Sequence, residues 1–250
     1  MSVGPTFRAG LVASLIATVC CGVAAAEPLP RFHCYRMVSD ATVDQAVTLT
    51  DQFGQIEMSI DRLYRICNPT DANDQDPGAV GRTEHLTEYA LHPLNGYIPP
   101  RQISVTNEFG TEVLATGHNP PPRSLLVHST VSDTPPAPSP PAPGAVSHFT
   151  CYHVHRQPGR LIEEVDLEDE TGTESFNTRR ADELCIPAKM DDEDVVAGDK
   201  PLLCYVLRRL GDPPAARTVH ASDEFGSSAV TLLTERKHRL CVPSTVVELP

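Results

Sequence analysis

One five-residue pattern recurs along this chain and constrains its fold more than any other feature. Its fullest form is His148-Phe149-Thr150-Cys151-Tyr152, and versions of it open four successive segments. Each segment continues through an Asp or Asn followed by Gly at a turn, and most of them close at a Cys followed by a Pro. Self-similarity of this kind indicates a fold assembled from copies of one unit, here 31–69, 85–129, 148–187 and 201–244.

The spacing of these landmarks sorts the four copies into two kinds. The first and third copies are shorter between their opening and closing landmarks than the second and fourth. A proline-rich linker, 134–146, separates the second copy from the third, and its composition favours an extended spacer. We therefore expect two tandem domains, 27–133 and 147–250, each a pair of β modules that folds without the other.

The cysteines predict which positions are joined. The chain has eight, of which Cys20 and Cys21 lie in the N-terminal segment discussed below. The second copy lacks both its opening and its closing Cys, which are replaced by Glu88 and Leu126. Loss of both at once is expected when the two form one bond inside a module. The predicted disulfides are therefore Cys34–Cys67, Cys151–Cys185 and Cys204–Cys241.

Apolar and polar residues alternate between the landmarks, as in Ile56-Glu57-Met58-Ser59-Ile60. This period of two indicates half-buried strands, and only Thr178–Leu184 offers a short helical alternative. The sequence thus predicts an all-β fold, sandwich or barrel-like, built from pseudo-duplicated, disulfide-closed modules. At three turns we expect a core ring followed by a glycine with positive φ: Phe53-Gly54, Phe109-Gly110 and Phe225-Gly226.

The N-terminal residues 1–26 have the layout of a secretory signal peptide. Arg8 precedes an apolar run, and Ala24-Ala25-Ala26 then provides a cleavage site before Glu27. The run is short for a membrane-spanning helix, so we expect no transmembrane segment after signal removal and a secreted, periplasmic or cell-surface protein. Lipid attachment at Cys20 is the alternative. A net charge of −13 and the lack of a basic cluster argue against nucleic-acid binding.

Several stretches carry a likeness to a known family: Asp51-Gln52-Phe53-Gly54, Cys67-Asn68-Pro69, His148-Phe149-Thr150-Cys151-Tyr152 and Leu240-Cys241-Val242-Pro243-Ser244. They resemble exported bacterial domains of unknown function whose repeats alternate HFxCYxV, DQFG and LCNP with HLxCYxI, NQFG and LCVPS. The likeness spans the mature chain outside the linker. It implies export and a repeated extracellular domain, and it implies no activity. The chain departs from the pattern at Thr171, where Phe is usual, and at His128, where Pro is usual.

Three features could hold a metal ion, and each has a simpler explanation. His153 and His155 share one face of a predicted strand, but no third ligand accompanies them. Asp71–Gly78 places oxygen ligands at alternate positions, yet it departs from a calcium loop at its Gly and Glu positions. The acidic run Asp191–Asp194 lies in the matching connector. We interpret these features as a surface strand and solvated connectors, and we expect no metal and no cofactor.

The motifs also bear on function. The chain contains no G-x-S-x-G, no H-E-x-x-H and no phosphate-binding loop, so no catalytic residue is assigned. The recurring residues are apolar, aromatic, Cys, Gly and Pro, which build a scaffold. The absence of Trp weakens a sugar-binding platform. We therefore expect a non-catalytic extracellular or cell-surface binding or structural protein with an unknown extracellular or envelope partner. The alternative is a secreted hydrolase with an unrecognised carboxylate site.

Overall fold

The computed structural model describes residue 1 and residues 28–117, 122–156, 163–235 and 237–250. Within these residues the regular structure is almost entirely β-strand, apart from a 3-10 turn at Ala79–Gly81. The predicted all-β fold is therefore confirmed. Thr178–Leu184, the stretch with a helical alternative, lies inside a strand. The expected signal peptide, 1–26, lies outside the described residues apart from Met1.

The strands follow the four copies in chain order. The first copy contains β1 (Arg31–Val38), β2 (Thr42–Asp51) and β3 (Gly54–Ala72). The second contains β4 (His85–Asn95), β5 (Gln102–Asn107), β6 (Gly110–Thr116) and β7 (Ser124–Ser132). The third contains β8 (His148–Arg156), β9 (Glu164–Asp169) and β10 (Gly172–Met190). The fourth contains β11 (Leu202–Arg209), β12 (Arg217–Asp223), β13 (Gly226–Leu232) and β14 (His238–Pro243), and β15 (Thr245–Glu248) follows it.

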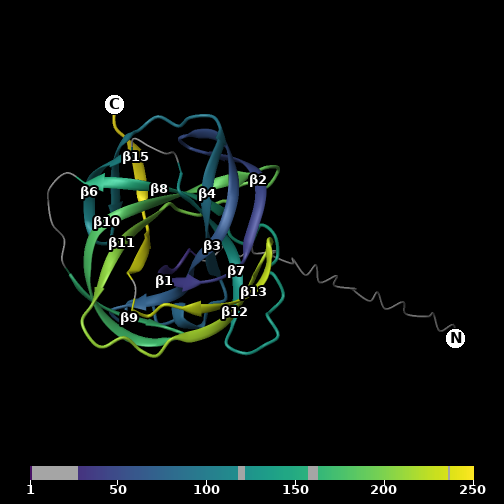
Figure 1. Cartoon of the computed structure of the whole chain (residues 1–250), viewed down its shortest axis with the longest axis vertical. Helices are drawn as coiled ribbons and strands as arrows, with labels where there is room; N and C mark the ends of the chain where they lie inside the picture. Colours follow the sequence, from purple (N-terminus) through teal and green to yellow (C-terminus); the bar gives the residue numbers. More distant parts are fainter. Residues whose placement is uncertain (2–27, 118–121, 157–162, 236) are drawn as a thin grey trace.

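The strands that open and close each copy pair side by side into a closed ring (Figure 1). Around the ring the antiparallel pairs are β1–β3, β3–β4, β4–β7, β7–β8, β8–β10, β10–β11 and β11–β14. The ring closes because β14 also pairs with β1, where Phe32 faces Cys241. Closure gives every ring strand a neighbour on both sides, which protects edges that would otherwise pair with other chains. The arrangement is thus barrel-like.

The remaining strand segments form one hairpin in each copy. Each hairpin turns at an Asp or Asn that faces a Gly: Asp51 and Gly54, Asn107 and Gly110, Asp169 and Gly172, Asp223 and Gly226. The side chain of the Asp or Asn accepts a hydrogen bond from the backbone N–H two residues later, at 2.7–2.9 Å. The predicted glycines all have positive φ: +144° at Gly54, +107° at Gly110 and +135° at Gly226. These turns therefore form as their local sequence predicts.

The ring strands bury residues on both faces. Successive side chains of a strand point to opposite faces, so Phe32 and Cys34 belong to one buried cluster while Tyr35 belongs to another. The smaller cluster contains the six cysteines and apolar residues such as Leu86 and Phe149. The larger cluster joins the other face of the ring strands to the hairpins. Burial on two faces explains why consecutive ring-strand residues, such as Phe32–Tyr35, are all buried.

The strand pairing corrects the expected division into domains 27–133 and 147–250. The proline-rich linker connects β7 and β8, which pair directly, with Leu126 facing Phe149. Chain ends from the two halves pair as well, since β1 contacts β14 and β15 contacts β5. Val146 is itself buried in the smaller cluster. The composition of the linker suggested a spacer, but it carries no information on whether the flanking strands pair. The two halves share one ring.

Candidate functional site

The three disulfides of the structure are the pairs that the repeats predict. Their sequence separations are 33, 34 and 37 residues, for Cys34–Cys67, Cys151–Cys185 and Cys204–Cys241 respectively. Each bond joins residues that face one another on neighbouring ring strands. In the second copy Glu88 faces Leu126 in the same way, which explains their joint replacement. Because all six cysteines in the described part of the chain are bonded and buried, they offer no thiolate for catalysis or metal binding.

The turn phenylalanines pack against tyrosines of other copies. Phe53 is buried, whereas Phe109 and Phe225 are partly buried against the larger cluster. The ring centroids are 5.2 Å apart for Phe53 and Tyr152, 5.2 Å for Phe225 and Tyr89, and 5.1 Å for Phe109 and Tyr205, all edge to face. This geometry is favourable for aromatic pairs. Phe53 thus lies in the core, whereas Phe109 and Phe225 pack at its edge, and the scaffold role of the three rings stays a prediction.

Each tyrosine also binds the turn of the copy two positions along the chain. The hydroxyl of Tyr152 donates to Asp51 at 2.6 Å, that of Tyr89 to Asp223 at 2.7 Å and that of Tyr35 to Asp169 at 2.7 Å. In the fourth case Asn107 Nδ2 donates to the hydroxyl of Tyr205 at 3.0 Å. Opposite copies are therefore tied together. Sequence reasoning recognised these tyrosines as landmarks and missed this role.

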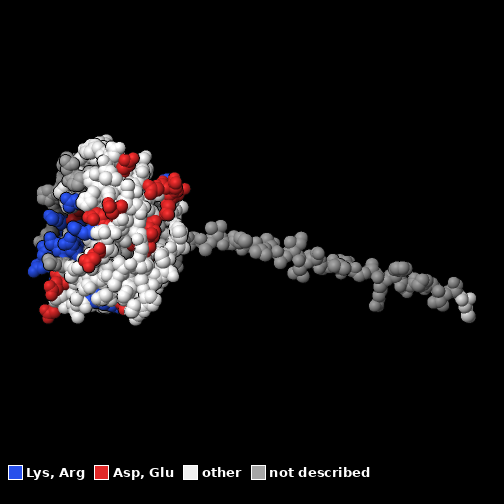
Figure 2. Space-filling view, turned by 45° about the vertical axis from the view of Figure 1, so that its right-hand side comes forward, with Lys and Arg blue, Asp and Glu red and all other residues white. Residues whose placement is uncertain are grey.

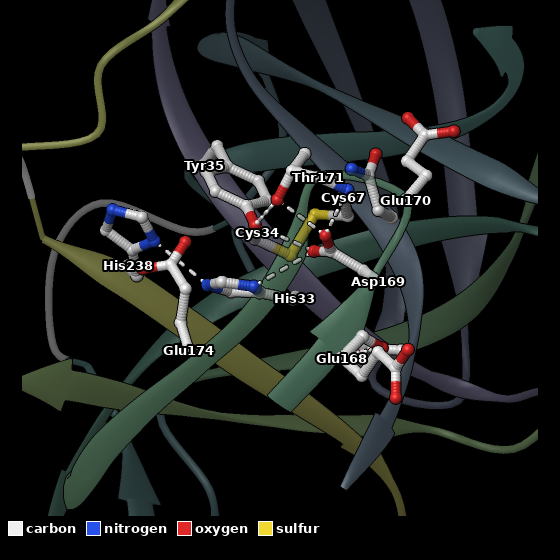
Figure 3. A network of polar contacts seen from close by, with 12 residues as sticks. His33, Cys34, Tyr35, Cys67, Glu168, Asp169, Glu170, Thr171, Glu174 and His238 are labelled. Carbon is white, nitrogen blue, oxygen red and sulfur yellow. Dashed lines mark hydrogen bonds and ion pairs between the residues drawn. A yellow bond between two sulfur atoms is a disulfide. The ribbon is translucent and has the colours of Figure 1, made fainter. Parts of the chain in front are cut away.

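Each turn together with the Tyr that it contacts is called a corner below, and one of the four corners departs from this pattern (Figure 3). There Thr171 stands in place of Phe, and its hydroxyl contacts both Tyr35 at 2.7 Å and Asp169 at 2.6 Å. His33 Nδ1 lies 3.0 Å from Asp169 Oδ2, and His33 Nε2 lies 2.9 Å from His238 Nδ1. The residue before the opening Cys is a His only here, because Thr87, Thr150 and Leu203 occupy the same position elsewhere. Copies one, three and four each contribute to this corner.

Burial and neighbouring charges shift the pKa values of three groups at this corner. Burial alone would raise the pKa of Asp169, but the hydrogen bond and charge of His33 and the hydroxyls of Thr171 and Tyr35 lower it overall. Burial, helped by the nearby charge of His33, lowers the pKa of His238 to about 3. Burial and the charge of Asp169 raise the pKa of Glu170 to about 7. His238 is therefore neutral and Asp169 is ionised at physiological pH.

The corner is closed to solvent. His33, Tyr35, Asp169 and His238 are only 1–3% exposed. Both oxygens of Asp169 and both nitrogens of each histidine already have partners. A cleft of about 530 Å³ lies outside, lined by Thr171 and Arg209 among others, but its lining includes neither histidine. A substrate in that cleft would not reach the imidazoles, so the geometry is that of a satisfied internal network.

A larger cleft, of about 620 Å³, is lined by basic residues that lie far apart in the sequence. Three arginines line it, Arg36, Arg62 and Arg123, and none of the described residues that line it is an Asp or a Glu. The rest of its wall is Tyr64 and small or apolar side chains. Figure 2 shows basic side chains gathered on one part of the surface of this acidic protein. The sequence predicts no basic cluster, but the fold brings Arg36, Arg62 and Arg123 together around one cleft.

A buried charge network lies behind this cleft. Tyr64 donates its hydroxyl hydrogen bond to Glu88, and Arg65 Nη1 donates to Glu88 Oε2 at 2.8 Å. Arg239 bridges Glu88, at 3.6 Å, and Glu183. Burial would raise the pKa of Glu88, but Arg65 and Arg239 lower it to about 2. Burial raises the pKa of Glu183 to about 8 despite Arg239.

The candidate metal ligands of the sequence fall in different places. The rings of His153 and His155 are 4.4 Å apart, but no third ligand within the described part of the chain joins them. In the connector Asp71–Gly78, Asp71 Oδ1 accepts a hydrogen bond from the backbone of Asp76 at 2.7 Å. The Asp191–Asp194 connector places Glu193 beside His148 and Glu224.

Comparisons with known proteins add no relative. No family model, no curated protein and no solved structure matches the chain. The likeness of its repeats to exported bacterial domains remains a prediction. In the described residues, no helix has the length and apolar character needed to cross a membrane.

Proposed function

We propose that this chain is an exported, non-catalytic binding protein and that its binding site is the arginine-lined cleft. The observation that carries the proposal is the gathering of Arg36, Arg62 and Arg123 around one cleft whose lining contains no acid. The chain has a net charge of −13, so most of its surface repels anions. A local group of positive charges therefore favours binding of an anionic ligand at this cleft.

The side chains that line the cleft indicate which kind of ligand it can bind. A guanidinium presents several N–H donors in one plane and binds carboxylate, sulfate or phosphate groups through paired hydrogen bonds. Leu63, Leu91 and Leu233 line the same cleft together with the ring of Tyr64. The site therefore suits a small or extended molecule with an anionic group and an apolar body. The surrounding acidic surface disfavours a long polyphosphate such as nucleic acid.

The scaffold supports a binding role and an exported location. Three disulfides join neighbouring ring strands, and such bonds persist in oxidising compartments outside the cytosol. The polar corner at His33 and Asp169 is buried and satisfied, as structural networks are. A rigid frame around this basic cleft is well suited to binding because few side chains have to be ordered when the ligand arrives.

The test uses an anionic probe with an apolar body, 8-anilinonaphthalene-1-sulfonate, followed by its fluorescence on the mature chain. We expect saturable binding that Arg62→Gln and Arg123→Gln each weaken about tenfold, because one charge-assisted hydrogen bond contributes about 1.5 kcal/mol. Arg217→Gln is the control, since Arg217 pairs with Asp133 and does not line the cleft. Equal weakening by all three substitutions, or the lack of saturation, would count against the proposal.

A secreted hydrolase is the second candidate, and the split between Glu88 and Glu183 favours it. Paired carboxyl groups with pKa values on opposite sides of neutrality are a mark of acid–base catalysis. Against it, both carboxyl groups are buried and bound by arginines. A broad hydrolase screen of the mature chain decides the matter: turnover that Glu183→Gln abolishes would replace the binding proposal.

A further inference from the structure

Three corners of the ring place a basic residue against an acid by the same rule. The residue three positions before the opening Cys, or before Glu88 in the second copy, contacts the residue that follows the turn Asp or Asn of the next copy. Arg31 Nε donates to Glu108 at 2.7 Å, His85 Nε2 lies 3.9 Å from Glu170, and His148 Nδ1 lies 3.4 Å from Glu224. Because the three pairs are equivalent by position, differences between them show what is particular to each.

The first of these corners holds a positive charge of its own. The guanidinium of Arg31 lies between Glu108 and Gln75, to which its Nη2 donates at 2.8 Å. Gln75 belongs to the connector that follows β3. In the third copy the matching connector follows β10 and supplies an acid, Glu193, whose Oε2 lies 2.9 Å from His148 Nε2. The guanidinium of Arg31 contacts one carboxylate, Glu108, whereas the shorter imidazole of His148 contacts two, Glu193 and Glu224.

The His148 corner has the contacts of a ligand set. One nitrogen of His148 and one carboxylate oxygen each of Glu193 and Glu224 lie within 4.8 Å of one another. The imidazole is almost fully buried, with 9% of the side chain exposed, and its Nδ1 has no hydrogen-bond partner. The carboxylates are more open, with 45% of Glu193 and 32% of Glu224 exposed. An ion could therefore enter from solvent and meet a fixed imidazole.

The connector that carries Glu193 is held in place. The backbone N–H of Glu193 donates to Met190 at 2.9 Å, which fixes it against the end of β10. Asp191 binds β2 twice, through its backbone N–H to Thr48 at 2.8 Å and through its side chain to the N–H of Thr48 at 2.8 Å. Glu193 therefore approaches His148 from an ordered turn.

We propose that His148, Glu193 and Glu224 form a binding site for a divalent transition-metal ion, with Zn²⁺ as the preferred ion. Imidazole and carboxylate are zinc ligands, whereas Ca²⁺ prefers six to eight oxygens. The two glutamates contact different nitrogens of His148, Glu193 at Nε2 (2.9 Å) and Glu224 at Nδ1 (3.4 Å). One ion can bind only one of these nitrogens, and Nδ1 is the one without a hydrogen-bond partner. The set is compact enough to share an ion, since one ligand atom from each residue lies within 4.8 Å of the other two. Two carboxylates balance the charge of the ion, and water completes its coordination.

The charges around the corner agree with this assignment. Burial raises the pKa of Glu224, and the neighbouring acids Glu193, Asp223 and Asp191 raise it further against His148. A bound dication would relieve this repulsion. The other cluster of potential ligands, Cys151, Glu183 and Cys185, is excluded because its two sulfur atoms form a disulfide.

The test is titration of the metal-free mature chain with Zn²⁺ in a calorimeter. We expect one bound ion, and we expect His148→Gln, Glu193→Gln and Glu224→Gln each to weaken binding at least tenfold. Matched controls are His85→Gln and Glu170→Gln, which alter the equivalent corner, where the histidine contacts one carboxylate instead of two, and His155→Gln, which alters the pair His153 and His155. These three should leave the affinity within twofold of the unchanged chain.

Glu193→Gln keeps the test decisive because Glu193 lies on an exposed connector and its loss leaves the ring intact. Circular dichroism of each metal-free variant checks the fold, and the absorption bands of bound Co²⁺ report a nitrogen and oxygen ligand set. The proposal fails if Zn²⁺ affinity survives Glu193→Gln, if His85→Gln weakens binding as much as His148→Gln, or if Ca²⁺ binds and Zn²⁺ does not.

Discussion

At the scale of single residues, this protein is shaped by one repeated set of contacts and by its exceptions. A turn Asp or Asn, an aromatic ring before Gly and a Tyr from the opposite copy recur at three corners. At the fourth, Thr171 leaves room for polar contacts, and His33 and His238 make them. A substitution in one copy is therefore best understood by asking what the other copies place there.

His238 gives this corner a pH dependence whose sign follows from its burial. Its pKa is about 3 in the folded protein, against an ordinary value of 6.5. Between these values the unfolded chain binds a proton that the folded chain does not, so the contribution of His238 is complete above pH 6.5 and declines as the pH falls toward 3. The loss is about 1.4 kcal/mol per pH unit at most.

Glu170 and Glu183 act in the opposite direction because their pKa values are raised by burial. The informative quantity is therefore the difference between the unchanged chain and His238→Asn, measured by urea unfolding at pH 7.5, 6 and 5. We expect the unchanged chain to lose stability relative to the variant as the pH falls. Parallel stability curves for the two proteins would show that His238 does not titrate on unfolding.

At the scale of the elements, the hairpins pack with one face of the ring strands to form the larger buried cluster. Each hairpin ends in a turn whose geometry is local, and its aromatic ring then packs on a distant Tyr. Phe53 is buried, while Phe225 is partly exposed. The two turns are equivalent in sequence but differ in how much apolar surface they bury.

Phe53→Ala should therefore destabilise the protein more than Phe225→Ala. Removal of a buried Phe costs about 3 to 5 kcal/mol, and we expect a value near the lower end for Phe53 and roughly half of it for Phe225. Unfolding by guanidinium chloride measures both. If neither substitution changed the free energy of unfolding by more than about 0.5 kcal/mol, the rings would have to be regarded as a binding surface.

At the scale of the whole molecule, the ring depends on all four copies. Pairs between the two halves, β7 with β8 and β14 with β1, complete it. In either half alone, two ring strands would each lose one of their two neighbours and become open edges, and part of the shared core would be exposed. The disulfides stabilise single copies, but none of them joins the halves.

Cleavage of the linker between Pro138 and Pro143 tests this dependence. We expect the nicked protein to elute as one particle in size-exclusion chromatography, because strand pairs across the halves remain. Each half produced alone should lack cooperative thermal unfolding. Two separate, folded halves after cleavage would restore the division into domains 27–133 and 147–250.

The sequence by itself determined the features that depend on neighbours along the chain. Alternating apolar residues predicted the strands, Asp51 and Gly54 predicted a turn, and the joint absence of two cysteines predicted the bonded pairs. Only the tertiary structure decided that the ring closes across the linker and that His33, Asp169 and His238 meet. The same holds for the three arginines of the cleft. Residues this far apart have no periodic relation in the sequence, because their contact depends on which strands pair.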